Sequence, residues 1–249
     1  MTLGAHITPV ARDHIASSDI IFVAASDALV ELWIHEMNPN VHSLQIYYAQ
    51  GKSRKQTYRE MVDVVISEVR KGQKVCCAFY GHPGVFACVP HRLIKKARAE
   101  GFKAIMEPGI SAEDSLIADL GIDPGQYGCQ QYETSQFMFY KRIIDPSAYL
   151  ILWQIGVAGD LTHGISVTGS QHRAVLLSLL YQNYPEDHPV IMYEAATLVI
   201  KQARSEEILL RDLINAELKD YTTLVIPPAC SLTRNNELIK RIKDIKLVG

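Results

Sequence analysis

Short apolar runs alternate with longer amphipathic stretches from residue 20 onward. The apolar runs at 20–25, 41–48 and 74–79 predict strands. Between them, the stretches 28–36 and 54–71 carry apolar residues at the three- and four-residue spacing of a helix. This alternation is typical of an α/β protein with a mostly parallel sheet.

The same alternation continues towards the middle of the chain. Helices are predicted at 91–100 and 112–120, and a short strand is predicted between them at 103–106. Each predicted helix is followed by a glycine, Gly101 or Gly121, the residue that most often ends a helix. The α/β pattern therefore extends at least to residue 120.

The stretch 139–148 mixes charges and a proline without a clear period, which predicts a domain boundary. We place an N-terminal domain at 1–145 and a C-terminal domain at 146–249. In the second domain the pattern predicts strands at 149–154, 190–193 and 222–226, and helices at 173–184, 208–216 and from 236 onward. Two α/β domains of this size predict a ligand cleft between them, at the carboxyl ends of the strands.

Composition excludes several classes of protein. The 249 residues are 48% hydrophobic and 21% charged, as in a globular protein, and the net charge of −2 lacks the basic excess that duplex nucleic acid attracts. No apolar run approaches the roughly 20 residues of a membrane span, and no signal peptide is visible, so we expect a cytoplasmic protein. The five cysteines form no C-x-x-C motif, which predicts reduced thiols rather than disulfides or a zinc site.

The first candidate segment for chemistry runs from a strand end through a glycine turn into a helix start. Ser53 and Gln56 have the spacing of a capping box, which fixes the phase of the helix. Arg54 and Tyr58 are four residues apart and then lie on one face of that helix, beside Tyr48. The alternative is structural, with the tyrosines completing a core and Arg54 solvated.

Two further candidate segments follow strand ends. In the loop 80–86, two glycines and a proline surround His82, so the backbone can approach a ligand closely. In the segment 107–114, Ser111 and Asp114 have the spacing of a helix N-cap, and the first amides of such a helix can hold a polar ligand. A plain turn and a plain cap are the alternatives. The glycine fingerprints of phosphate-binding loops are absent from the sequence.

In their order and spacing these three segments resemble the tetrapyrrole methylase superfamily, S-adenosylmethionine enzymes with two α/β domains and the cofactor in the cleft between them. Within it, the resemblance is strongest to the borosin peptide backbone N-methyltransferases, which methylate main-chain amides of a ribosomally made precursor peptide. The matching stretches are 51–58, 80–87, 108–114, 118–124 and 226–228. The similarity extends over nearly the whole chain, and the second and third stretches are specific when they occur together.

The resemblance implies a set of site residues. The candidates for catalysis are Tyr48, Arg54, Tyr58 and Tyr80. The candidates for contact with S-adenosylmethionine are Tyr80, His82, Val85, Phe86, Ser111, Ala112, Gln154, Tyr193, Ala195 and Thr222. Because the cofactor supplies the methyl group, no metal is expected.

Methylating a peptide nitrogen is difficult because its lone pair is delocalised into the carbonyl group. A suitable site needs a base near the nitrogen and fixed donors at the carbonyl oxygen. We expect Arg54 and Tyr58 to hold the oxygen and Tyr80 to orient the substrate. Tyr48 is the candidate base, and it would need its cationic neighbour to lower the pKa of its phenol.

The resemblance also implies a particular form of the enzyme. The family opens with an apolar strand and a G-x-G turn, and this chain begins at Met1 where that turn should finish, so either the first strand is missing or the start lies further upstream. Fungal relatives carry their substrate fused at the C-terminus, whereas this chain stops at Gly249. We therefore expect the split form, with a separate precursor peptide that has a helical leader. A homodimer, or a heterotetramer with the precursor, is expected as well.

Two alternative functions stay open. A methyltransferase of the same superfamily could act on a tetrapyrrole or another small molecule, although few Arg and His residues lie near the expected cleft to bind a macrocycle rich in carboxylates. A non-catalytic protein that binds the precursor peptide would transfer no methyl group. Calorimetry with the cofactor and the mass of a co-expressed peptide distinguish these functions.

Overall fold

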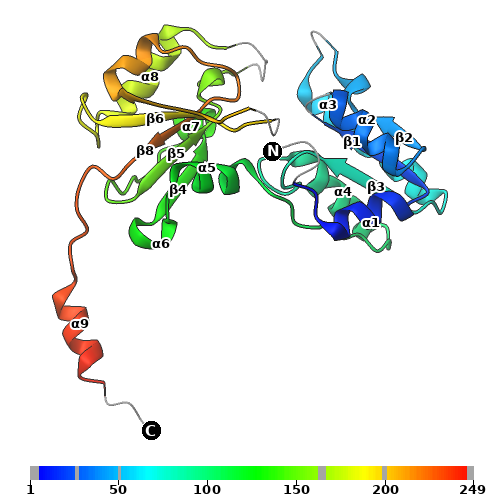
Figure 1. Ribbon diagram of the computed structural model, residues 1–249, viewed down its shortest axis with the longest axis horizontal. Helices are drawn as coiled ribbons and strands as arrows, with labels where there is room; N and C mark the ends of the chain where they lie inside the picture. The colour runs from blue at the N-terminus through cyan, green and yellow to red at the C-terminus, as the bar shows by residue number, and fades with distance from the viewer. Residues whose placement is uncertain (1–5, 26–27, 50–51, 162–166, 198–200, 246–249) are drawn as a thin grey trace. The chain divides into compact units, whose positions relative to one another are not determined.

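The chain folds into two compact units (Figure 1). The computed structural model describes residues 6–25, 28–49, 52–161, 167–197 and 201–245. Unit 1 comprises residues 1–122, 160–165 and 193–205, and unit 2 comprises residues 123–159, 166–192 and 206–249. The α/β class predicted from the sequence is confirmed, and each unit has its own sheet.

Unit 1 contains a three-stranded parallel sheet in the order β2-β1-β3. Its elements are α1 (Pro9–Ser17), β1 (Ile20–Ala24), α2 (Ala28–Met37), β2 (Val41–Ser43), a 3-10 turn η1 (Gln45–Tyr47), α3 (Arg54–Arg70), β3 (Val75–Phe79), α4 (Cys88–Ala99) and α5 (Ala112–Leu120). The apolar first strand of the family would precede α1, and residues 1–5 lie outside the described part of the chain.

Alternating side chains of β1 form two separate cores, one on each face of the sheet. Phe22 packs with Met61 of α3 and Leu93 of α4. Val23 packs on the other face with Ile34 of α2. Because successive side chains of a strand point to opposite faces, helices cover this sheet on both sides. This double cover explains why β1 is apolar at nearly every position.

Two predictions for unit 1 are wrong in detail. The predicted strand 41–48 ends at Ser43, whose hydroxyl accepts a hydrogen bond from the Gln45 amide at 3.2 Å and donates one to Glu31 at 2.7 Å. Such local side-chain bonds compete with a strand ladder and turn the backbone. The stretch 103–106 forms no strand, and α1 was not predicted.

Unit 2 contains a five-stranded sheet in the order β4-β5-β8-β6-β7, with β4 parallel and β8 antiparallel to β5. Its elements are α6 (Pro124–Tyr127), β4 (Cys129–Glu133), α7 (Thr134–Phe139), β5 (Tyr149–Trp153), η2 (Ile155–Val157), α8 (Ser170–Leu180), β6 (Pro189–Glu194), β7 (Arg204–Leu209), η3 (Leu210–Asn215), β8 (Thr223–Ile226) and α9 (Asn236–Lys243). The residues 193–205, at the ends of β6 and β7, are grouped with unit 1.

The domain boundary differs from the predicted one. Unit 2 begins at residue 123 rather than at 146, because β4 pairs with β5 along its whole length. The stretch 139–148 is therefore a connection inside unit 2. The predicted helix 208–216 is present as the 3-10 helix η3, and its start was placed two residues too early. β7 continues to Leu209, and the backbone amide of Leu210 then bonds to the carbonyl of His188 at 2.9 Å.

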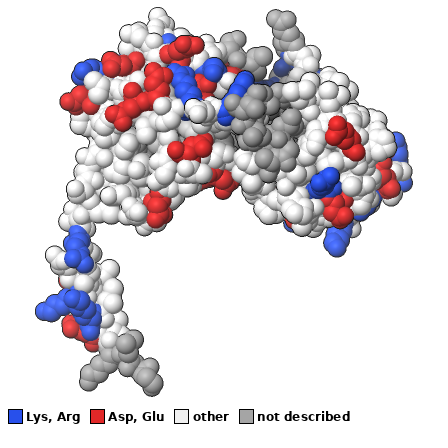
Figure 2. All heavy atoms as spheres, in the orientation of Figure 1, with Lys and Arg blue, Asp and Glu red and all other residues white. Residues whose placement is uncertain are grey.

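All five cysteines are free. None of the helices in the described ranges combines the length and the apolar character needed to cross a bilayer. In α9 no residue is buried, and its last turn carries three basic side chains, which belong to the blue group at the lower left of Figure 2.

Candidate functional site

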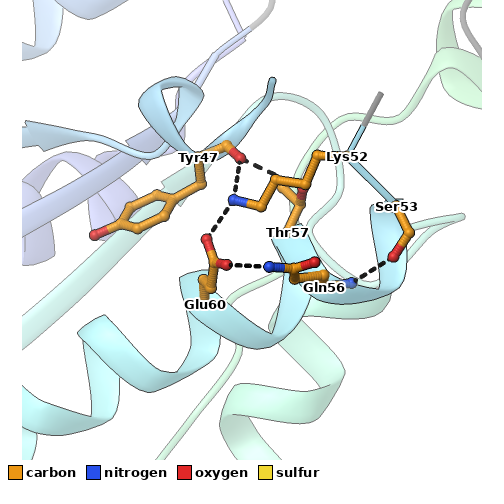
Figure 3. Close-up of polar contacts among 6 residues, drawn as sticks. All are labelled: Tyr47, Lys52, Ser53, Gln56, Thr57 and Glu60. Carbon is orange, nitrogen blue, oxygen red and sulfur yellow. Dashed lines mark hydrogen bonds and ion pairs between the residues drawn. The ribbon is translucent and has the colours of Figure 1, made fainter. Parts of the chain in front are cut away.

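The N-terminus of α3 is held by a network of polar contacts (Figure 3). Ser53 caps the helix, with its hydroxyl accepting from the Gln56 amide at 3.2 Å. The side chain of Gln56 donates to Glu60 at 3.1 Å instead of reaching back to the cap. The cap itself is confirmed, but the expected reciprocal half of the capping box is absent from this helix start.

The same network fixes the backbone just before Tyr48. The Lys52 ammonium donates to the carbonyl oxygen of Tyr47 at 2.9 Å, and the hydroxyl of Thr57 donates to that oxygen at 3.4 Å. Lys52 is in turn paired with Glu60. Because one carbonyl receives donors from Lys52, just before α3, and from Thr57, in the first turn of α3, the chain at Tyr47 and Tyr48 is tied to that helix start.

Three of the predicted catalytic side chains meet at this point. Arg54 donates through Nη1 to the hydroxyl oxygen of Tyr58 at 3.4 Å. The rings of Tyr48 and Tyr58 lie edge to face with their centroids 6.4 Å apart. Helix phase thus places Arg54 and Tyr58 on one face beside Tyr48, as predicted from their four-residue spacing.

The electrostatics of this cluster differ from the prediction for Tyr48. Burial, together with the charge and hydrogen bonding of Tyr58, raises the pKa of Tyr48 to about 12, although Arg54 acts in the opposite direction. The guanidinium of Arg54 therefore acts in the expected direction, but it does not outweigh burial and Tyr58, so the pKa of this phenol is raised rather than lowered. Burial lowers the pKa of Arg54, but its bond to Tyr58 and the nearby phenols outweigh burial and raise it.

Tyr80 belongs to the same electrostatic environment. Its charge contributes to the pKa values of both Tyr48 and Arg54, so its phenol lies within interaction range of both. The backbone amide of Tyr80 donates to the carbonyl of Ala24 at 3.4 Å, at the end of β1. The ring is 60% exposed, which leaves most of it accessible to a ligand.

The loop 80–86 is shaped by the imidazole of His82. Its Nδ1 accepts from the amide of Gly84 at 3.0 Å, and the His82 carbonyl accepts from the amide of Val85 at 3.1 Å. Phe86 then adopts a positive φ of 50°, a region that side chains other than glycine rarely occupy. Val85 and Phe86 are exposed as a result. The His82 ring therefore shapes the loop through its contact with the Gly84 amide.

The helix start at Ser111 lies against this loop. A Cβ atom at Gly109 would sit 2.3 Å from the carbonyl oxygen of Gly81, so the two backbones touch. Ser111 caps α5 as predicted, and with Asp114 it forms a full capping box, in which the Ser111 amide donates to the carboxylate at 2.6 Å. These bonds to Ser111 lower the pKa of Asp114, and His82 contributes in the same direction. The exposed loop residues and Ala112, the first residue of α5, are thus brought together.

Tyr193 is placed differently from the other aromatic candidates. Its ring is fully buried, and its hydroxyl donates to Asp119 at 2.7 Å. Burial and this bond raise the pKa of Tyr193. Ala195 follows after the end of β6 and is half-buried. Asp119 had no role in the predicted site, although it lies in the matching stretch 118–124, and only that match pointed to it.

The two candidates in unit 2 lie on neighbouring strand ends. Gln154 follows β5 with a positive φ of 59° and is exposed, whereas Thr222 precedes β8 and is fully buried. The amide of Ile155 donates to the carbonyl of Thr222 at 2.9 Å, which joins the two positions. The hydroxyl of Thr222 accepts from the amide of Lys219 at 2.8 Å. Thr222 therefore holds the ends of β5 and β8 together through its hydrogen bonds, whereas the side chain of Gln154 is exposed.

Several known proteins are similar in sequence to most of this chain. The chain is 34% identical over 246 residues to a methyltransferase and type I borosin cyclic peptide precursor of Coprinopsis marcescibilis, covering 95% of this chain and 63% of that protein. It is 35% identical over 237 residues to a methyltransferase and omphalotin A precursor of Omphalotus olearius, covering 94% of this chain and 57% of that protein. The chain thus spans about three fifths of the length of these relatives.

Solved structures show the same fold at much lower identity. Uroporphyrin-III-C-methyltransferase from Thermus thermophilus matches with a TM-score of 0.64 at 14% identity, covering 92% of this chain and 90% of that one. A cobalt precorrin-4 methyltransferase matches with a TM-score of 0.61 at 14% identity, covering 89% and 88%. Residues 3–212 match the family described as Tetrapyrrole (Corrin/Porphyrin) Methylases. The chain therefore belongs to the tetrapyrrole methylase family.

Proposed function

We propose that this protein is a methyltransferase that uses S-adenosylmethionine to methylate backbone amide nitrogens of a separate, ribosomally made peptide. The observation that carries the proposal is the cluster of Arg54, Tyr58 and Tyr48, with Tyr80 in electrostatic range. Relatives at about 35% identity are named as methyltransferases joined to cyclic peptide precursors. The names of these relatives support a peptide substrate. We propose in addition that the substrate peptide is a separate chain.

The residues around the loop 80–86 suit S-adenosylmethionine, which supplies an electrophilic methyl group when bound. At Gly109 a Cβ atom would meet the Gly81 carbonyl at 2.3 Å, closer than a side chain allows, and at Gly84 it would meet the Met106 sulfur at a tight 3.0 Å. The N-terminus of α5, at Ser111 and Ala112, is favourable for a carboxylate because of the helix dipole. The contributions of Gln154 and Thr222 stay predictions.

Arg54 and Tyr58 are suited to an amide oxygen that gains negative charge. The Tyr58 oxygen already accepts from Arg54, so its own O–H can donate to a third group. Arg54 keeps its charge at all relevant pH values and has further N–H donors. Two donors fixed before the reaction stabilise the charge without the cost of reorganising water. This is the condition under which the amide nitrogen becomes nucleophilic once it loses its proton.

The proton on the nitrogen is assigned to Tyr48 in this proposal. With its pKa raised to about 12, the Tyr48 phenol is protonated at neutral pH, so only a small fraction is ready to act as a base. Tyr80 orients the peptide next to this group. Because little of the Tyr48 phenolate is present at neutral pH, we expect slow turnover that rises with pH. If Tyr48 only packs against the substrate, turnover should not depend on its ionisation.

The proposal is tested by incubating the protein with S-adenosylmethionine and a co-purified or co-expressed peptide that is not covalently attached. Mass spectra should show methyl increments, and fragmentation should place them on backbone nitrogens. Arg54→Lys serves as the matched variant, because it keeps the charge but loses the planar fork. Methylation of a tetrapyrrole and of no peptide would replace the proposal with the small-molecule alternative. Cofactor binding without any transfer would favour a peptide-binding protein.

The assembly is also proposed and not observed. We propose a homodimer of the methyltransferase, or a heterotetramer with two copies of a precursor peptide that has a helical leader. Light scattering on the protein alone and with the peptide measures both masses. A monomer in both conditions would contradict this part of the proposal without touching the chemistry. A cytoplasmic location stays a prediction from the sequence.

A further inference from the structure

A shallow depression on the surface of unit 1 lies between α3 and α4. It has a volume of about 350 Å³ and is lined by Lys55, Arg59, Val62, Asp63, Arg92 and Lys96. Lys55 and Arg59 are four residues apart on α3, and Arg92 and Lys96 are four residues apart on α4. Each helix therefore presents a pair of cations to the same depression.

The positive charges in this depression are only partly balanced by the protein. Asp63 pairs with Lys96 at 2.7 Å and is the single carboxylate of the lining. In the described ranges of the chain, Lys55, Arg59 and Arg92 form no ion pair. Like charges four residues apart on a helix are mutually unfavourable, and here four cations gather in a protein whose net charge is −2. An anionic partner would relieve this repulsion.

A second depression adjoins the first at Arg92. It has a volume of about 460 Å³ and is lined by Gly84, Phe86, Ala87, Cys88, His91 and Arg92. Arg92 lines both depressions. His91 is held to the carbonyl of Gly84 at 2.8 Å, and the ring of Phe86 is 59% exposed. The cationic surface thus leads along α4 to the loop at which the cofactor is proposed to bind.

We propose that the depression between α3 and α4, the α3–α4 surface, binds an acidic segment of the peptide substrate. The cations are spread over two helices on an open surface, and none of them is buried. This arrangement does not surround a single phosphate group from several sides. Carboxylates repeated along a peptide match such a spread. The inference rests on the proposed peptide substrate and adds the chemistry and the place of the contact.

This contact would act by raising the local concentration of substrate. Several weak ion pairs at an exposed surface hold one part of the peptide, while another part reaches the loop 80–86 as an intramolecular event. The acidic segment is therefore distinct from the residues that are methylated. Methyl transfer to a short peptide without the acidic segment should not depend on the α3–α4 surface.

The experiment compares the parent with an Arg59→Glu, Arg92→Glu double variant. The control is a Lys95→Glu, Lys103→Glu double variant, which makes the same change in net charge at exposed positions outside the depression. The probe is a fluorescein-labelled helical peptide with glutamates at i and i+4, and its binding is followed by anisotropy at several salt concentrations. Thermal melts check that all variants fold.

We expect salt-sensitive binding to the parent, near-parent binding to the control, and binding to the Arg59→Glu, Arg92→Glu variant weakened roughly tenfold or more. Equal binding to parent and variant would overturn the inference. So would equal binding of a peptide with glutamine in place of glutamate, or complete displacement by inorganic phosphate at the concentration of the peptide. Normal anisotropy results with no peptide methylated would leave the α3–α4 surface in place and remove the proposed function.

Discussion

Replacing Tyr58 by phenylalanine isolates the proposed oxygen donor. The substitution removes one hydroxyl and keeps the ring that packs beside Tyr48. The lost contact with Arg54 is 3.4 Å long and lies near the surface, so its net contribution to the free energy of unfolding is at most about 1 kcal/mol. The fold should therefore survive Tyr58→Phe with a small change in melting temperature.

The effect on the reaction should be much larger than the effect on stability. Charge on the amide oxygen develops only on the way to the transition state, and removal of one preorganised donor at such an oxygen costs about 2.7 to 4 kcal/mol. That corresponds to a rate of methyl transfer lowered roughly a hundredfold to a thousandfold. Cofactor affinity should stay near the parent value because the hydroxyl is assigned to the peptide.

Single-turnover methylation with saturating cofactor, alongside thermal melts and calorimetry, separates these effects. The variant also removes a group that raises the pKa of Tyr48, so the phenol should titrate at lower pH in an absorbance titration. A Tyr58→Phe variant that turns over at the parent rate would refute the assignment of the hydroxyl to the oxygen. A variant that loses stability rather than rate would show that the pair with Arg54 is structural.

Four further predictions follow from individual contacts. Lys52→Met should lower turnover with little change in cofactor affinity, because the Tyr47 carbonyl loses a donor and Tyr48 loses its fixed position; kcat and calorimetry measure the two effects. Gly109→Ala should destabilise unit 1 by about 1 to 3 kcal/mol in thermal melts and weaken cofactor binding, because its Cβ atom would clash with the Gly81 carbonyl. Gly169→Ala serves as the control, because the space around Gly169 is open. The single-turnover rate should rise with pH in step with ionisation of Tyr48, whose pKa is about 12, and a flat profile would exclude it as the base. The lowered pKa of Asp114 stabilises the fold above its unfolded pKa of about 3.9, so the deficit in melting temperature of Asp114→Asn should shrink as the pH falls through the folded pKa.

Periodicity predicted those elements whose side chains report burial directly. β1 and α3 were predicted within a residue or two because their apolar positions follow the period of a strand or a helix. β4 was missed because its sequence, Cys-Gln-Gln-Tyr-Glu, is polar, as an edge strand allows. Because β4 was missed, the domain boundary was predicted too late in the chain. The pairing of β4 with β5 places the start of unit 2 before residue 129.

In the candidate site, too, local contacts were predicted and long-range contacts were not. Helix phase was enough to bring Arg54 and Tyr58 together, because both lie on one helix and local geometry determines their spacing. The bond between Tyr193 and Asp119 joins residues 74 positions apart, and no local pattern predicts such a pair. The contacts of Lys52 were also missed, because Lys52 precedes α3 and its partner Glu60 lies on the helix two turns further on.

The charge balance of the cluster bears on how an amide can be methylated here. Arg54 places one positive charge beside two phenols, yet the net effect of burial and of Tyr58 keeps Tyr48 protonated. In the proposed mechanism the positive charge of Arg54 therefore stabilises an oxygen and does not create a strong base. If the carbonyl oxygen of a bound peptide takes up the Arg54 and Tyr58 donors, the acidity of its N–H rises, because the anion formed is the species those donors stabilise. A weak base is then sufficient. On this argument, loss of Tyr48 should slow the reaction less than loss of the Tyr58 hydroxyl, an order of effects that single-turnover rates of Tyr48→Phe and Tyr58→Phe compare directly.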